Sequence, residues 1–279
     1  MMRARLASDL RTIRTLAVRS FAETIQSLGI YVALSIIVLS VSLTLLVYQD
    51  ILATDYVLVL SNPFSLALVV AAVMFSIYLG ALSCISIAKE KETGTLFILC
   101  AGPVNQVNFI LGHLVAQLLT FLFMTGVLLV DFFLMAQLTQ FYFSVRVLLG
   151  LLYAVFAVSA ISLLGAFLAV LTGRVRAGVL AFIVVLLVGI ALQILDSFLY
   201  NPDLRNVDAN LFFIGRAVHA MNAVLQWLSP FAHLLNGFQA LAIQNWSLVW
   251  LNGLASILFA CLFLFLTIRV METRGVRPE

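Results

Sequence analysis

Residues 63–87 read PFSLALVVAAVMFSIYLGALSCISI, a stretch without a single charged side chain. A helix needs about 20 consecutive apolar residues to cross the hydrocarbon core of a bilayer. The stretch is long enough, and it lacks the strict alternation of polar and apolar residues that membrane strands show. It therefore predicts a transmembrane helix.

Five more stretches of this kind lie along the chain. The six predicted spans are residues 27–48, 63–87, 107–135, 147–171, 177–199 and 248–270. The whole sequence is 64% hydrophobic and 10% charged, whereas an average soluble protein has about 25% charged residues. We therefore predict an all-α membrane protein that forms one domain, residues 1–279, with no separate soluble domain.

The N-terminal segment, residues 1–26, combines arginines with regularly spaced apolar residues. The apolar positions recur at helical spacing and are Leu6, Leu10, Ile13, Ala17, Phe21 and Ile25. This pattern predicts an amphipathic helix on the cytoplasmic membrane surface; the alternative is a basic tail that only sets the topology. The segment is too long for the charged region of a signal peptide, so we expect the span 27–48 to be retained.

Residues 200–247 separate the fifth and sixth predicted spans. The segment opens with the turn-like Asn201-Pro202-Asp203 and then becomes apolar again. Leu211–Leu228 and Phe231–Ile243 are each too short or too polar to span. We predict that they form external re-entrant helices, which are tolerated in a membrane when they are buried against protein.

Charge decides the orientation. With a cytoplasmic N-terminus, twelve Lys and Arg residues fall on the inside and three, Arg146, Arg205 and Arg216, on the outside. Cytoplasmic segments carry such an excess of positive charge. We therefore expect a multi-pass protein of the bacterial inner membrane with both termini in the cytoplasm.

The sequence contains no catalytic or metal-binding motif. The only lysines, Lys89 and Lys91, do not follow a glycine, so no phosphate-binding Gly-Lys-Ser/Thr loop is present. Any ATP must therefore be bound by a partner. Asp131 and Asp196 are the acidic residues that an ion-coupled carrier would use, but both lie beyond the midplane, where a carboxylate costs less to hold.

The one charged island between spans is the loop from Lys89 to Pro103. Four alternating charges in Lys89-Glu90-Lys91-Glu92 directly follow a span, and Gly94 breaks the helix there. Thr95 is suited to cap a new helix, which ends at Pro103. We predict a short amphipathic helix at the cytoplasmic surface; the alternative is a simple loop that fixes the topology.

Two separate motifs resemble those of ABC-2 type transporter permeases. The first is IAKEKETGTL at residues 87–96, followed by Pro103-Val104 and Ile110-Leu111-Gly112. The second is LSPFAH at residues 228–233, followed by Gly237. Family members often have an acidic residue and a lysine where this sequence has Phe97 and His113.

The resemblance implies a dimer of permease subunits, identical or not, each docked to a cytoplasmic ATP-binding cassette ATPase that carries ATP and magnesium. It assigns coupling to the ATPase to Glu90, Glu92, Gly94, Thr95, Leu96 and Pro103, with Arg11, Arg14 and Arg19 nearby. It assigns a substrate path to Met74, Phe75, Tyr78, Phe182 and Leu186. It assigns an external re-entrant motif to Pro230, Phe231, His233 and Gly237.

The expected function is export of a hydrophobic or amphipathic substrate, driven by ATP hydrolysis on the partner subunit. The chain itself is not expected to be an enzyme or to bind nucleic acid, and its other partner is the lipid bilayer. Two alternatives stay open: a membrane protein that relays ATP-driven force to another protein without moving a solute, and a stand-alone secondary carrier.

Overall fold

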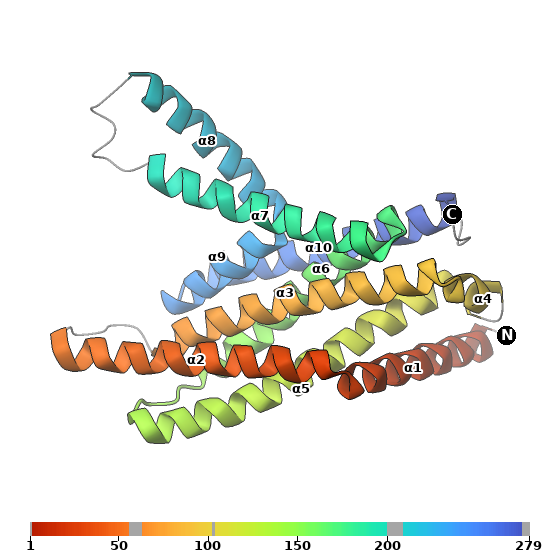
Figure 1. Ribbon diagram of the computed structural model, residues 1–279, viewed down its shortest axis with the longest axis horizontal. Helices are drawn as coiled ribbons and strands as arrows, with labels where there is room; N and C mark the ends of the chain where they lie inside the picture. The colour runs from red at the N-terminus through yellow and green to blue at the C-terminus, as the bar shows by residue number, and fades with distance from the viewer. Residues whose placement is uncertain (1, 56–62, 102–103, 200–208, 275–279) are drawn as a thin grey trace.

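The computed structural model describes the backbone of residues 2–55, 63–101, 104–199 and 209–274, and the side chains of residues 8–52, 63–101, 104–191 and 216–273. Within these ranges the secondary structure is helical and contains no strand. The helices, labelled in Figure 1, are α1 Met2–Gln26, α2 Leu28–Asp55, α3 Pro63–Glu92, α4 Thr95–Ala101, α5 Gln106–Thr139, α6 Arg146–Thr172, α7 Val175–Leu199, α8 Ala209–Leu228, α9 Pro230–Ala242 and α10 Trp246–Arg274.

Five of these helices, α2, α3, α5, α6 and α10, are long and apolar enough to cross a membrane. They coincide with five of the six predicted spans. The sixth predicted span, 177–199, is a helix, α7, but its described apolar part is Val175–Ala191, which is shorter than the typical span of about 20 residues. The count of six spans therefore stays a prediction.

Several hydroxyl side chains inside the spans bond to the helix that carries them. Ser76, Thr120 and Ser256 each donate to the carbonyl four residues earlier, at 2.7, 2.9 and 2.9 Å. Such bonds satisfy a polar group where no water is available. These residues therefore do not interrupt the apolar helices.

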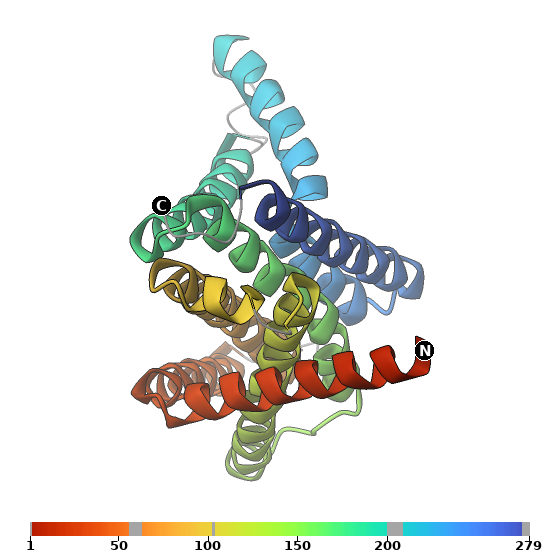
Figure 2. The ribbon, with the colours of Figure 1, turned by 90° about the vertical axis from the view of Figure 1, so that its right-hand side faces the viewer.

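The centre of the bundle is the pair α3 and α6. They pack closely, and α6 also contacts α5, α7, α9 and α10 (Figure 2). The two backbones lie in close contact at Gly80 and Gly165, where a Cβ added to Gly165 would overlap the carbonyl oxygen of Gly80. Small residues permit such close approach between membrane helices. The ring of Phe182 on α7 covers the same point, since a Cβ on Gly80 would lie 2.5 Å from its Cζ.

The bundle has two distinct ends. One end, called here the α4 end, carries α4, the turn between α6 and α7, and the last turns of α10, with α1 lying across it (Figures 1 and 2). The opposite end, called the α9 end, carries the turns between α5 and α6 and between α9 and α10. All residues of the predicted coupling loop that the structure describes therefore lie at one end.

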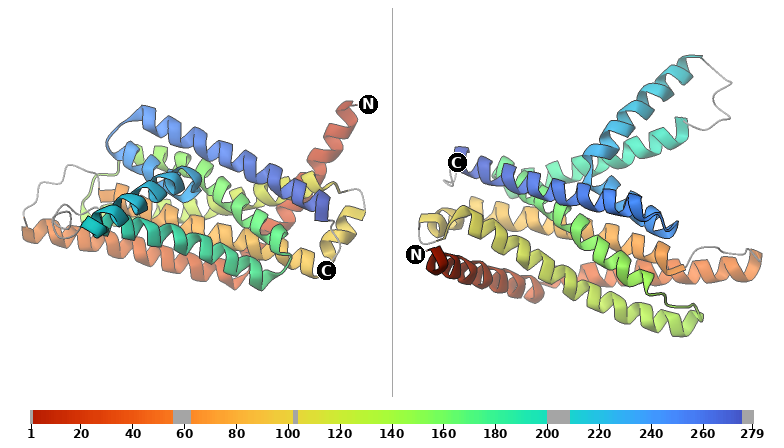
Figure 3. Two further views of the ribbon diagram at one scale, coloured as in Figure 1. Left: turned by 90° about the horizontal axis from the view of Figure 1, so that it is seen from above. Right: turned by 180° about the vertical axis from the view of Figure 1, so that it is seen from behind.

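The predicted pair of helices between the last two spans is present as α8 and α9. α8 packs along α7, and the end of α7 and the start of α8 project away from the other helices (Figure 3). α9 instead packs against α10, α6 and α3. Re-entry of these helices into a membrane stays a prediction.

A methyl group at the α3–α6 contact tests this packing. Gly165→Ala is expected to lower the free energy of unfolding by about 1–3 kcal/mol, because the added Cβ would push apart two backbones. Thermal unfolding of the detergent-solubilised chain measures the change. Gly126→Ala in α5 is the control: no atom lies within 4 Å of its added Cβ, so the better helix propensity of alanine should leave it equally or more stable. Equal destabilisation of both variants would contradict the proposed contact.

Candidate functional site

The candidate site is the α4 end, where the chain turns from α3 into α4. Gly94 sits in the turn with φ of 73°, a conformation that residues with a Cβ rarely adopt. Its carbonyl accepts from the N–H groups of Phe97 and Ile98 at 3.1 and 3.2 Å, so it begins α4. The hydroxyls of Thr93 and Thr95 lie 2.9 Å apart across the turn. The predicted helix break at Gly94 is therefore confirmed.

Lys91 connects this turn to the end of α6. Its side chain is 6% exposed, and Nζ donates to the carbonyl oxygen of Val170 at 3.1 Å. The last carbonyls of a helix lack partners within that helix, and a cation there also interacts favourably with the helix dipole. Gly173 ends α6 with a φ of 70°. A Cβ atom added at this glycine would lie 3.2 Å from Nζ of Lys91. Glycine at 173 therefore leaves room for the lysine.

Glu92 connects the same turn to the start of α7. Its Oε2 accepts from the N–H of Val175 at 3.3 Å, one of the four N–H groups that a helix N-terminus leaves without a helical partner. Lys91 and Glu92 together hold the end of α3 against both sides of the α6–α7 turn. Two neighbouring side chains of opposite charge thus bind two different helix ends.

Glu90 points to the other side, toward α1. It is half-buried, its Oε2 has no hydrogen-bond partner among the described residues, and the charges of Arg19 and Glu23 act on it. Arg19 Nε itself bonds Glu23 Oε1 at 2.9 Å, and this hydrogen bond raises the pKa of Arg19 above its ordinary value. Arg11 and Arg14 are exposed on the same helix.

The helix α1 is fixed to the start of α5 by close packing and one hydrogen bond. A Cβ on Gly112 would lie 2.9 Å from Cβ of Leu16 and 3.3 Å from the carbonyl oxygen of Ile13. Asn108 Nδ2 donates to Asp9 Oδ1 at 2.8 Å. These contacts attach α1 to the start of α5, and the partly buried Glu90 of α3 lies near Arg19.

The short helix α4 has one buried and one exposed apolar side. Leu96 is 1% exposed and packs into the core, whereas Phe97 and Ile98 are 41% and 71% exposed. The thiol of Cys100 is partly buried, and this burial raises its pKa and keeps it neutral. Pro103 lies outside the described residues. The large apolar side chains that α4 exposes are therefore Phe97 and Ile98.

The residues of the second motif form a hydrogen-bonded group between α9 and its neighbours. Pro230 begins α9, and the imidazole of His233 is placed 3.0 Å from Asn252 Oδ1 of α10 and 3.0 Å from the carbonyl of Trp227. The hydroxyl of Tyr153 on α6 donates to the carbonyl of His233 at 2.5 Å. A Cβ on Gly237 would overlap the Tyr153 ring. The motif therefore fixes α9 to α6 and α10.

Comparison with protein families finds that residues 59–269 match the model described as ABC-2 family transporter protein. The chain belongs to the ABC-2 transporter family. The match includes both motifs and most of the bundle, while α1 and α2 precede it. A comparison with curated proteins gives no match.

The five residues that family resemblance places on a substrate path differ in how deeply they are buried in this ABC-2 protein. Phe75 is buried against Phe121, with ring centroids 5.9 Å apart, and Phe182 is buried over Gly80. The other three, Met74, Tyr78 and Leu186, are partly buried and pack at the edge of the core. The structure thus separates two core residues from three peripheral ones, and the role of all five stays a prediction.

Sequence reasoning missed several residues that organise this ABC-2 protein. Nothing distinguishes Lys91 from Lys89 in the sequence, because its partner Val170 is far away in the chain. Gly173 carried a signal, since a glycine directly after an apolar run is typical of a helix end. Tyr153 and Asn252 gave a weaker sequence signal, because they are polar residues within otherwise apolar spans.

The two lysines give a matched test. Lys91→Met removes the bond to the Val170 carbonyl and leaves that group without its partner, so we expect a loss of about 1–3 kcal/mol in the free energy of unfolding. Lys89→Met removes the same charge from an exposed side chain and should change little. Thermal unfolding of the two purified variants, compared with wild type, measures both. If Lys89→Met were the more harmful change, the role given to Lys91 would be wrong.

Proposed function

We propose that this chain is the permease subunit of an ABC exporter, driven by a separate cytoplasmic cassette ATPase. Membership of the ABC-2 family supports an ABC transporter permease. The sequence has no phosphate-binding loop of its own, so hydrolysis falls to the partner. The α4 end would then face the cytoplasm, together with both chain termini.

The observation that carries the proposal is the pair of exposed apolar side chains on α4. Phe97 and Ile98 project from a short helix whose opposite side, at Leu96, is fixed in the core. Exposed apolar groups on a rigid support are typical of protein-docking surfaces. The exposed arginines of α1, Arg11 and Arg14, lie at the same end and would add a charged border.

The contacts at this end suggest how force would pass into the membrane. ATP shifts the equilibrium between two states of the permease only if the docked ATPase binds α4 differently in each. Lys91 and Glu92 join the end of α3 to the α6–α7 turn, so a displacement of α4 would move α3, α6 and α7 together. Glu90, beside Arg19, would pass part of the same displacement to α1.

The second subunit and the class of substrate are proposed from resemblance to the family. A second permease subunit would complete the complex, and the substrate would be a hydrophobic or amphipathic molecule that moves outward. The exposed apolar residues of α7, among them Leu180 and Leu187 at 62% and 55% exposure, offer a surface for the second subunit or for lipid.

The proposal is tested by isolating the tagged chain from its native membrane in a mild detergent. We expect a cassette ATPase to co-purify and the complex to hydrolyse ATP. Absence of any ATPase, with no response of the chain to added ATP, would instead favour a stand-alone carrier. Transport of a solute into proteoliposomes separates export from a pure relay of force.

A negative charge introduced at Ile98 tests whether the exposed side of α4 binds the ATPase. Ile98→Asp is expected to weaken the ATPase complex about tenfold or more, because loss of a central apolar contact at an interface costs about 2 kcal/mol or more. Binding of the purified ATPase to the immobilised permease measures the effect. The control is Tyr142→Asp, which makes the same kind of change at an 83% exposed residue of the α9 end. Unchanged binding in Ile98→Asp would remove α4 from the interface.

A further inference from the structure

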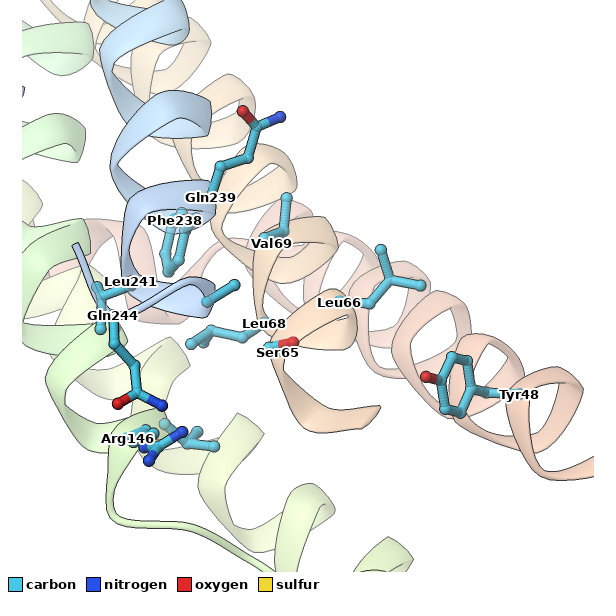
Figure 4. Close-up of a pocket in the computed structure, with 13 residues that line it drawn as sticks. Tyr48, Ser65, Leu66, Leu68, Val69, Arg146, Phe238, Gln239, Leu241 and Gln244 are labelled. Carbon is cyan, nitrogen blue, oxygen red and sulfur yellow. The ribbon is translucent and has the colours of Figure 1, made fainter. Parts of the chain in front are cut away.

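A groove opens at the α9 end, on the opposite side of the bundle from α4. It lies between α3, α6 and α9, with Tyr48 of α2 at its edge (Figure 4). Its volume of about 340 Å³ falls within the range of ligand pockets, about 300–1,000 Å³. None of the residues discussed for coupling lines it.

The groove is amphipathic. Its walls are made by apolar side chains, including Leu68, Val147 and Phe238, of which all three are buried. At the end of the bundle, Figure 4 shows the guanidinium of Arg146 next to the amide of Gln244. Among the described residues that line the groove, Arg146 is the one that carries a charge.

The position of Gln244 is fixed by the turn between α9 and α10. Its φ is 58°, a left-handed conformation that is uncommon for glutamine. The turn holds it there through hydrogen bonds from Gln244 N–H to the Leu241 carbonyl at 3.2 Å and from Asn245 N–H to the Ala240 carbonyl at 2.8 Å. With its amide oxygen turned to Arg146, Gln244 accepts from Nη1 and Nη2 at 3.0 and 3.1 Å.

The charge of Arg146 is not neutralised by this contact. Its partner is a neutral amide, and no carboxylate in the described part of the chain forms an ion pair with it. Arg146 is also the first residue of α6, where the positive end of the helix dipole disfavours a cation. A bound anion would offset both the side-chain charge and the dipole. Guanidinium groups bind phosphate oxygens especially well, through paired hydrogen bonds.

We propose that this groove binds one anionic phospholipid, with its phosphate at Arg146 and an acyl chain along Leu68, Val69 and Phe238. A lipid fits better than a free phosphate ion because the apolar walls lie directly beside the guanidinium. The first residue of a spanning helix also lies at the depth of the lipid headgroups. The proposal concerns a different part of the molecule from the coupling surface and does not depend on it.

Native mass spectrometry of the full-length chain in detergent tests the proposal, with dioleoyl phosphatidylglycerol and dioleoyl phosphatidylcholine as probes. We expect wild type to bind one phosphatidylglycerol in preference to phosphatidylcholine. Arg146→Gln should lower the affinity for phosphatidylglycerol about tenfold, since one charge-assisted contact is lost. The preference over phosphatidylcholine should disappear with it. Val69→Trp, which fills the apolar part of the groove, should weaken binding of both lipids.

Arg216→Gln on α8 is the matched control, because it removes the same charge from an exposed residue that does not line the groove. It should bind both lipids as wild type does. An equal loss in this variant, or no preference for phosphatidylglycerol in wild type, would overturn the proposal. Inorganic phosphate, added as a competitor, should not displace the lipid; displacement by phosphate alone would mean a simple anion site and would also overturn it.

Discussion

The architecture depends on how closely α3 and α6 approach each other. The two helices run in the same direction, and contacts recur along their length. Gly150 faces Leu68 near one end, Gly165 faces Gly80 in the middle, and Lys91 reaches the Val170 carbonyl at the other end. A membrane offers little hydrophobic driving force between helices, so close packing must supply the stability. Glycines at the middle contact allow two backbones to touch without intervening side chains.

This parallel pair joins the two ends of the molecule. At one end α3 continues into Lys91, Glu92 and the turn at Gly94, while at the other α6 begins with Arg146 beside the groove. Because both helices are rigid and tightly packed, a displacement of α4 would be transmitted along them instead of being absorbed locally. Gly173 and Gly94 are the points where the chain leaves this pair with a positive φ.

The sequence predicted the elements well where a local pattern determines them. The span predicted at 63–87 is α3, the helix break at Gly94 is present, and the pair of helices predicted between the last spans is α8 and α9. The sequence did not predict which residues of an apolar helix face are buried. Leu10 and Ala17 lie on the same predicted apolar face, yet they are 58% and 1% exposed. The bond from Lys91 to Val170 depends on a neighbour that is distant in the chain.

The arrangement of the chain ends has a practical consequence for studies of this protein. α1 crosses the α4 end, and the last turns of α10 reach that end as well. A fluorescent protein fused beyond α1 or α10 would therefore be attached at the same end as the exposed Phe97 and Ile98. The connection between Gln140 and Ser144 lies at the other end of the 34-residue helix α5. A short epitope inserted there would label the molecule far from α4.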